Sequence, residues 1–119
     1  MKKRFAIPIY KAEVWLVVAE DMVAARKKMV DLFGDLPTDM EDAAAICSYD
    51  GSGRVGLFFA QEELCVEVIA HEVFHATHRL LDWAATNFDK DHHEHAALLH
   101  GYIMDLVMKE IYILKAKLK

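Results

Sequence analysis

The feature that most constrains this chain is the sequence His-Glu-Val-Phe-His at residues 71–75. Its apolar surroundings predict one long helix over about residues 62–85. Residues four apart lie on the same face of a helix, one turn above each other. The imidazoles of His71 and His75 can therefore be directed at one point, and zinc accepts imidazole nitrogens at about 2.0–2.1 Å. The pentapeptide thus predicts a two-histidine clamp for a metal ion.

The glutamate of the pentapeptide is the candidate for acid–base chemistry. Glu72 follows the first histidine directly, so it points to the side of the face that the histidines share. It cannot join the clamp from there, but it can reach a water molecule held by the metal. His-Glu-x-x-His on a helix divides the roles in this way in metalloproteases. We therefore predict zinc as the cofactor, with His71 and His75 as ligands and Glu72 as the catalytic general base. The alternative is a pair of surface or core histidines that bind no metal.

A catalytic zinc usually holds three protein ligands and keeps one position open. Candidates for the third ligand gather at residues 91–95, at the start of a helix expected over about residues 92–117. Glu94 can reach the clamp, because the nine residues 86–94 span up to about 30 Å when extended. Glu94 also fits a capping box with Asp91, in which it would only satisfy a backbone donor. The neighbouring histidines that could bind the metal instead are His92, His93 and His95.

His-Glu-x-x-His followed by eighteen residues and Glu resembles the signature of the gluzincin metallopeptidases. The stretch VIAHEVFHATHRLLDW…HEHAALLHGYI is more similar to minimal zincin-like proteins of phages and prophages. The resemblance covers about residues 54–112. It implies a zinc-dependent metallopeptidase that hydrolyses peptide bonds through a zinc-bound water. It also implies Glu94 as the third ligand beside His71 and His75, with Glu72 as the base. The motif leaves the substrate undefined.

The rest of the chain predicts an α+β fold with a zincin-like core, formed by one domain over residues 1–119. Asp21 and Gly34 are expected to begin and end the first helix. Pro8 limits residues 5–10 to an edge strand, so the small twisted sheet has three strands, or four if this segment pairs. The predicted strands are Ala12–Ala19, residues 43–49 and Arg54–Ala60, and the three predicted helices cover residues 21–33, 62–85 and 92–117.

The strand before the motif helix is the expected substrate-binding element. Its side chains alternate, so one set faces the core and the strand can form an edge of the sheet. An extended peptide can then pair with it, backbone to backbone. The predicted substrate-binding residues are Arg54, Val55, Gly56, Leu57 and Phe58.

Four other polar residues near the motif are not expected to bind the metal. His78 shares the histidine face one turn further on, so we expect it in the wall of the site. Asp82 and Asp105 are expected to be surface or interhelical partners, and Tyr102 is best explained by the core.

Composition limits the partners and the compartment. The net charge is −5 and the sequence pI is about 5.7, so no global field favours nucleic acid. No apolar run is long enough to predict a membrane span, and the N-terminus is expected to be mature sequence. Cys47 and Cys65 have no metal or redox spacing, which predicts two reduced, buried thiols. We therefore expect a cytoplasmic protein of a bacterium or a phage-infected cell, with a peptide or protein substrate. The alternative is a non-catalytic regulatory or interaction module in which the metal only stabilises the fold.

Overall fold

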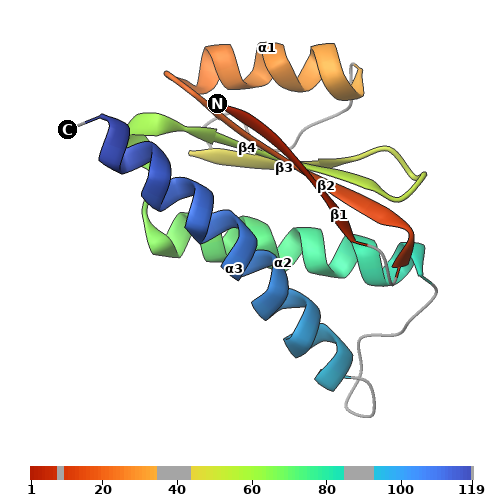
Figure 1. The fold of residues 1–119 in the computed structure, drawn as a ribbon. Helices are drawn as coiled ribbons and strands as arrows, with labels where there is room; N and C mark the ends of the chain where they lie inside the picture. Colours follow the sequence, from red (N-terminus) through yellow and green to blue (C-terminus); the bar gives the residue numbers. More distant parts are fainter. Residues whose placement is uncertain (8–9, 35–43, 85–92, 119) are drawn as a thin grey trace.

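The computed structural model describes residues 1–7, 10–34, 44–84 and 93–118 (Figure 1). It confirms the α+β class, with a four-stranded mixed sheet between helical layers. The strands are β1 (Lys2–Ile7), β2 (Ala12–Ala19), β3 (Ala45–Tyr49) and β4 (Arg54–Ala60). The helices are α1 (Met22–Phe33), α2 (Val66–Trp83) and α3 (His93–Lys117), with a short 3-10 helix η2 (Gln61–Glu63) before α2. Among the described helices, none is both long and apolar enough to cross a membrane.

The sheet has the strand order β1-β2-β4-β3. β2 and β4 form a parallel pair at its centre, and β1 and β3 flank them in antiparallel orientation. Both central strands are apolar on both faces, which suits strands that are covered on both sides. α1 lies over one face of the sheet, and α2 and α3 lie over the other (Figure 1).

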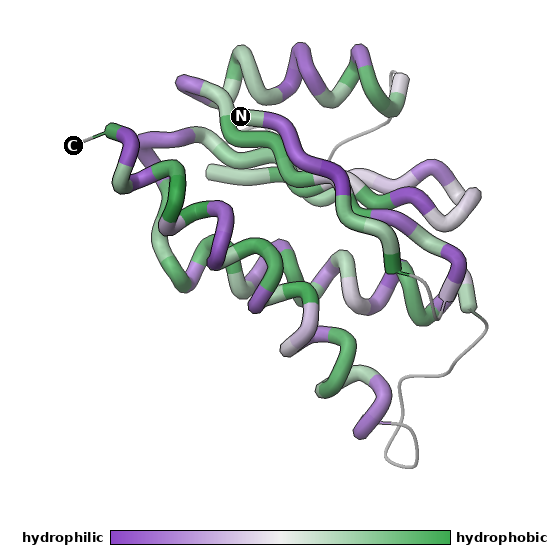
Figure 2. Tube along the Cα trace, in the orientation of Figure 1, coloured by the Kyte–Doolittle hydropathy of each residue, from purple (hydrophilic) through white to green (hydrophobic). Residues whose placement is uncertain are grey.

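Two apolar clusters, one on each face of the sheet, hold these layers together. Alternation along β4 sends Val55, Leu57 and Phe59 into the larger cluster, which they share with α2 and α3. Phe58 points the other way and meets Phe33 of α1 edge to face, with ring centroids 5.7 Å apart. The hydropathy colouring in Figure 2 shows that β2 and β4 are mostly hydrophobic where the helices cover them.

The predicted ends of the first helix are confirmed. Asp21 is the N-cap of α1, and its Oδ1 accepts a hydrogen bond from Ala24 N at 2.9 Å. Gly34 ends the helix with a φ of 81°, a left-handed value that glycine adopts without steric cost. The motif helix begins later than expected, because the chain returns to an extended conformation at Leu64 and Cys65 before α2.

The expected fourth strand is present, and it begins earlier in the chain than predicted. β1 covers Lys2–Ile7 rather than residues 5–10, and it is an edge strand that pairs with β2. Three charged side chains in its first half are exposed, which is a common way to protect an edge strand.

The prediction that Arg54–Ala60 forms a free edge for substrate is wrong. β4 pairs with β2 on one side and with β3 on the other, and its residues Val55, Gly56, Leu57 and Phe58 are buried. The most apolar strand of the sheet lies at its centre because burial there removes most apolar surface from water. The edge on this side of the sheet is β3.

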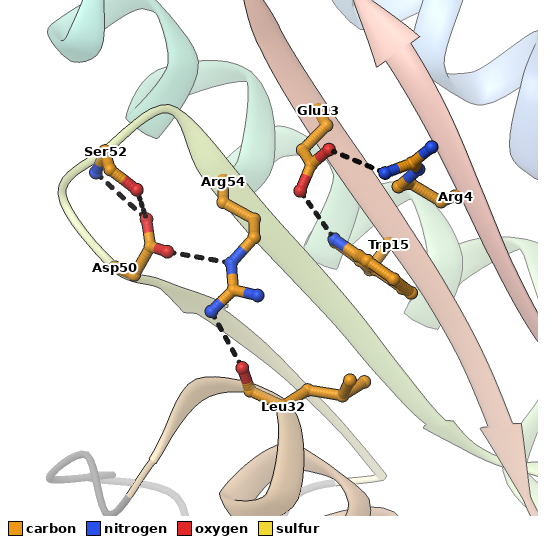
Figure 3. Close-up of polar contacts among 7 residues, drawn as sticks. All are labelled: Arg4, Glu13, Trp15, Leu32, Asp50, Ser52 and Arg54. Atoms are coloured by element: carbon orange, nitrogen blue, oxygen red, sulfur yellow. Dashed lines mark hydrogen bonds and ion pairs between the residues drawn. The ribbon is translucent and has the colours of Figure 1, made fainter.

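Arg54 has a structural role in place of the predicted substrate contact. Its Nε donates to Asp50 Oδ2 and its Nη2 donates to the carbonyl oxygen of Leu32, both at 2.7 Å (Figure 3). The guanidinium also lies 4.4 Å from the ring centroid of Phe33. Arg54 therefore connects the turn between β3 and β4 to the end of α1.

Two smaller expectations are also wrong. Cys65 is exposed at the start of α2, and Cys47 is only partly buried, so the thiols are not both core residues. Tyr102 is 48% exposed on α3, on a face that does not contribute to the core.

Candidate metal and catalytic site

The site is built on α2, whose four sides have different environments. Ile69, Val73 and Leu80 are buried against the sheet. At about 100° per residue, the two motif histidines lie on the opposite, exposed side of the helix. Glu72 lies on the flank toward β3, and Phe74 lies on the flank toward α3. The two motif histidines therefore lie on the side of α2 that does not pack against the sheet.

The two histidines lie close enough to share one ion. Nε2 of His71 and Nε2 of His75 are 3.2 Å apart, and the ring planes meet at 74°. Two nitrogens bound to a tetrahedral zinc at about 2.0–2.1 Å would be about 3.3–3.4 Å apart. The same separation also allows a hydrogen bond between the rings if one nitrogen carries a proton. The geometry therefore fits the clamp with almost no rearrangement.

Electrostatics around His75 favour the form that binds a metal. Partial burial lowers the pKa of His75 below its ordinary value, and the nearby His71, Arg79 and His78 lower it further. A lower pKa leaves the imidazole neutral, with a lone pair available for coordination.

Glu72 is buried, with only 3% of its surface exposed. Burial raises the pKa of its carboxyl group, and the charge of His71 partly opposes this effect. Its Oε2 has no hydrogen-bond partner among the described residues. A buried carboxyl oxygen without a partner is unusual in folded proteins and calls for an explanation such as an ordered water, a bound ion or a functional role. Glu72 is therefore a buried carboxyl group next to His71, with one oxygen that no described residue satisfies.

The β3 side of the site contains residues that the motif did not identify. The Arg79 guanidinium lies 3.9 Å from the ring centroid of Tyr49, at the end of β3. Burial, with a contribution from Glu72, raises the pKa of Cys47 to about 12, although Arg79 opposes it. A thiol with a raised pKa gives up its proton less readily than an ordinary cysteine does. Arg79 lies seven residues after Glu72, and this helical spacing was a signal that sequence reasoning passed over.

β3 directs part of its backbone away from the sheet. Asp50 N donates to Arg54 O at 3.2 Å, and Ala60 N donates to Ala44 O at 3.4 Å. Hydrogen-bonded pairs alternate in an antiparallel ladder, so the even-numbered residues of β3 bond to β4. Ala45, Cys47 and Tyr49 then turn their N–H and C=O groups toward the outer side of the strand. Among the described strands, no partner pairs with this outer side of β3.

A cavity of about 300 Å³ lies on the other flank of α2, against α3. Its lining is apolar apart from three histidines and one threonine: Phe74, Thr77, His78, Leu81, His93, Ala96, Ala97 and His100. The Phe74 ring contacts His75 on one side and His100 on the other, with both pairs of centroids 6.4 Å apart. The cavity therefore lies next to the histidine pair, and His78 is a wall residue as expected.

The third ligand is not brought into place in the part of the chain that the structure describes. Within residues 1–7, 10–34, 44–84 and 93–118, no group of three or more His, Cys, Asp or Glu side chains could hold a metal. Glu94 and His95 are exposed on the first turn of α3, and His93 lines the cavity. His92 and Asp91, the proposed capping partner, lie outside the described residues.

The acidic residues near the site behave as surface partners. Asp82 Oδ1 lies 4.0 Å from His78 Nε2, and Asp105 Oδ2 lies 2.9 Å from Lys109 Nζ. Both pairs are exposed and one helical turn apart, as expected for surface pairs.

Comparison with known proteins identified no relative of this chain. The chain matches no protein-family model, no curated protein and no solved structure at a significant level.

Proposed function

We propose that this chain is a zinc-dependent metallopeptidase that hydrolyses peptide bonds. One observation carries the proposal: two imidazole nitrogens 3.2 Å apart lie beside a buried carboxylate whose Oε2 has no partner among the described residues. This combination supplies both a metal clamp and a base, and a purely structural helix has no need of it.

His71 and His75 would hold the zinc ion, and Glu94 or one of the neighbouring histidines would complete the site. When bound, zinc would polarise the scissile carbonyl group and lower the pKa of a water molecule toward about 7. The low pKa of His75 supports this role, because the neutral imidazole is the ligand.

Glu72 would move the protons. Its Oε2 accepts a proton from the attacking water and then donates it to the nitrogen of the leaving amine. Burial supports the first step, because it raises the carboxyl pKa and so makes the anion a stronger base. Helical periodicity keeps the carboxylate beside the clamp and outside it.

The substrate would lie extended along the outer side of β3. The outward N–H and C=O groups of Ala45, Cys47 and Tyr49 can pair with a peptide backbone. The apolar cavity beside Phe74 is large enough for one apolar side chain of that peptide. This arrangement replaces the rejected one at β4.

The test combines metal analysis with a cleavage assay. Protein loaded with equimolar zinc and desalted should retain about one ion per chain, and it should cleave members of a peptide library by a chelator-sensitive reaction. Loss of the zinc on desalting would refute the proposal. Retained zinc without any cleavage would favour the alternative, a regulatory module with a structural metal.

A further inference from the structure

α3 has a second, exposed face that its packing on the sheet does not use. The buried residues of α3 form one stripe. On the other side, at about 100° per residue, four residues lie within about 20° of one line along the helix. These are Leu98, Asp105, Lys109 and Ala116. Flanking residues are Tyr102 and Ile113 on one side of the line and Gly101 and Tyr112 on the other.

This face is unusually apolar for an exposed surface. The exposed fractions are 66% for Leu98, 70% for Tyr112 and 49% for Ile113. The charged pair Asp105 and Lys109 interrupts the apolar residues at the middle of the face, with Nζ and Oδ2 2.9 Å apart. Exposed apolar residues that gather on one face of a helix are typical of an interaction surface.

The pattern of charges on this face is complementary to itself. When two copies of α3 pair antiparallel about position 107, residues equally distant from that position on opposite sides meet. Asp105 then lies opposite Lys109 of the second copy, and Leu98 lies opposite Ala116 of the second copy. A parallel pairing would instead place Asp105 against Asp105, which costs energy. For two copies of this chain, the charges therefore favour the antiparallel orientation over the parallel one.

Gly101 supports the same arrangement independently. Glycine weakens a helix interior relative to alanine, so its presence in the middle of α3 needs a reason. Among the described residues, no atom lies within 4 Å of the place where a Cβ of residue 101 would stand. Packing against the described part of the chain thus gives no reason. In the antiparallel pair, each flank of the face meets the same flank of the second copy. Gly101 then lies close to Tyr112 of the second copy, and its missing side chain leaves room for the ring.

We propose that α3 pairs antiparallel with α3 of a second copy of this chain, and that the exposed face is a two-fold symmetric homodimer interface. α2 packs on a different side of α3, through the residues that line the cavity. The pairing therefore uses a different face of α3 from the one that contacts α2, and it does not depend on the proposed peptidase activity.

Sedimentation equilibrium of the full chain tests this, over concentrations from about 5 to about 500 µM, a range that brackets the affinity of a small interface. The wild type should change from monomer to dimer within this range. Asp105→Lys places like charges together twice in each dimer, so its dissociation constant should rise at least about tenfold. The double variant Asp105→Lys/Lys109→Asp restores complementarity and should dimerise like the wild type.

The variant Gly101→Gln distinguishes an effect on folding from an effect on dimerisation. The open space around Gly101 accepts the longer side chain in the monomer, so the melting temperature measured at low concentration should not fall. In the dimer that side chain meets Tyr112, so the dissociation constant should rise at least about tenfold. Val23→Gln changes another exposed apolar residue, 79% exposed on α1, and should leave pairing unchanged. A wild type that stays monomeric at all concentrations, or single α3 variants that pair as tightly as the wild type, would overturn the proposal.

Discussion

Nε2 of His71 and Nε2 of His75 lie 3.2 Å apart on the exposed face of α2. Helix pitch brings the two residues to one face of α2, and their side-chain rotamers bring the nitrogens together. His71→Ala and His75→Ala should each reduce zinc affinity at least about tenfold, because one imidazole of the clamp is lost. His78→Ala is the matched control one turn further along the helix, and its zinc affinity should stay close to that of the wild type. Isothermal titration with zinc measures all three variants, and equal affinities would remove the clamp from consideration.

Glu72→Gln keeps the size of the side chain and removes the base. Zinc should remain bound, while any peptide hydrolysis should fall by roughly two to four powers of ten. The same change should raise the melting temperature, because an amide costs less to bury than a carboxylate without a partner. Activity and thermal melting are measured on the same preparation. Undiminished cleavage by the variant would point to a contaminating peptidase.

Substitution of Glu94 distinguishes a site in which this residue binds zinc from a site in which it only caps α3. If Glu94 is the third ligand, Glu94→Ala should weaken zinc binding strongly, whereas His93→Ala and His95→Ala should leave it unchanged. If Glu94 only caps α3, its removal should lower the free energy of unfolding by about 0.5–2 kcal/mol and leave zinc bound. Zinc titration and chemical denaturation of the three variants distinguish these cases.

The sequence predicted the helices well because their signals are local. The caps at Asp21 and Gly34 and the apolar stripe of α1 depend only on neighbouring residues. The histidine clamp has the same origin, since i and i+4 residues meet on any helix. The two rings do lie close together on α2, and their binding of a metal stays a prediction.

The arrangement of strands could not be predicted in the same way. Strand order depends on contacts between distant segments, and alternation along Arg54–Ala60 is compatible with an edge or a centre. The same limit applies to the third ligand, because the approach of α3 to α2 is a tertiary property. Tyr102 was assigned to the core because an aromatic residue on a mostly apolar helix can fit either side, and the structure places it on the exposed face.

The outer edge of β3 predicts a pattern in the substrate. Only every second residue of a paired peptide directs its N–H toward the strand. N-methylation of a cleaved peptide should therefore reduce kcat/KM by about tenfold or more at alternate positions, about the value of one lost hydrogen bond in a desolvated pair. Methylation at the intervening positions should have little effect. A scan of singly methylated peptides measures this, and a uniform response along the peptide would exclude pairing with β3.

Asp50 predicts a pH dependence of stability in the turn between β3 and β4. Its Oδ1 accepts hydrogen bonds from Ser52 N at 2.9 Å and Ser52 Oγ at 2.7 Å, and its Oδ2 accepts one from Arg54 Nε at 2.7 Å (Figure 3). Partial burial tends to raise the pKa of Asp50, but these hydrogen bonds and the Arg54 charge outweigh it and hold the pKa below 3.8. The folded state thus binds a proton less readily than the unfolded chain.

The stabilisation from Asp50 is consequently complete above the unfolded pKa and is lost as the pH falls through the lower folded pKa. Asp50→Asn keeps the acceptor for Ser52 and removes the charge, so near pH 7 the variant should be less stable by about 0.2–1 kcal/mol, the range of an exposed ion pair. Between about pH 5 and pH 3 the wild type should lose stability faster, and the two curves should converge at lower pH. Ser52→Ala should reduce the pH dependence in the same direction, because it removes one of the donors that hold the charged form. Denaturant unfolding at a series of pH values measures the difference, and parallel curves for wild type and Asp50→Asn would show that the turn does not titrate with folding.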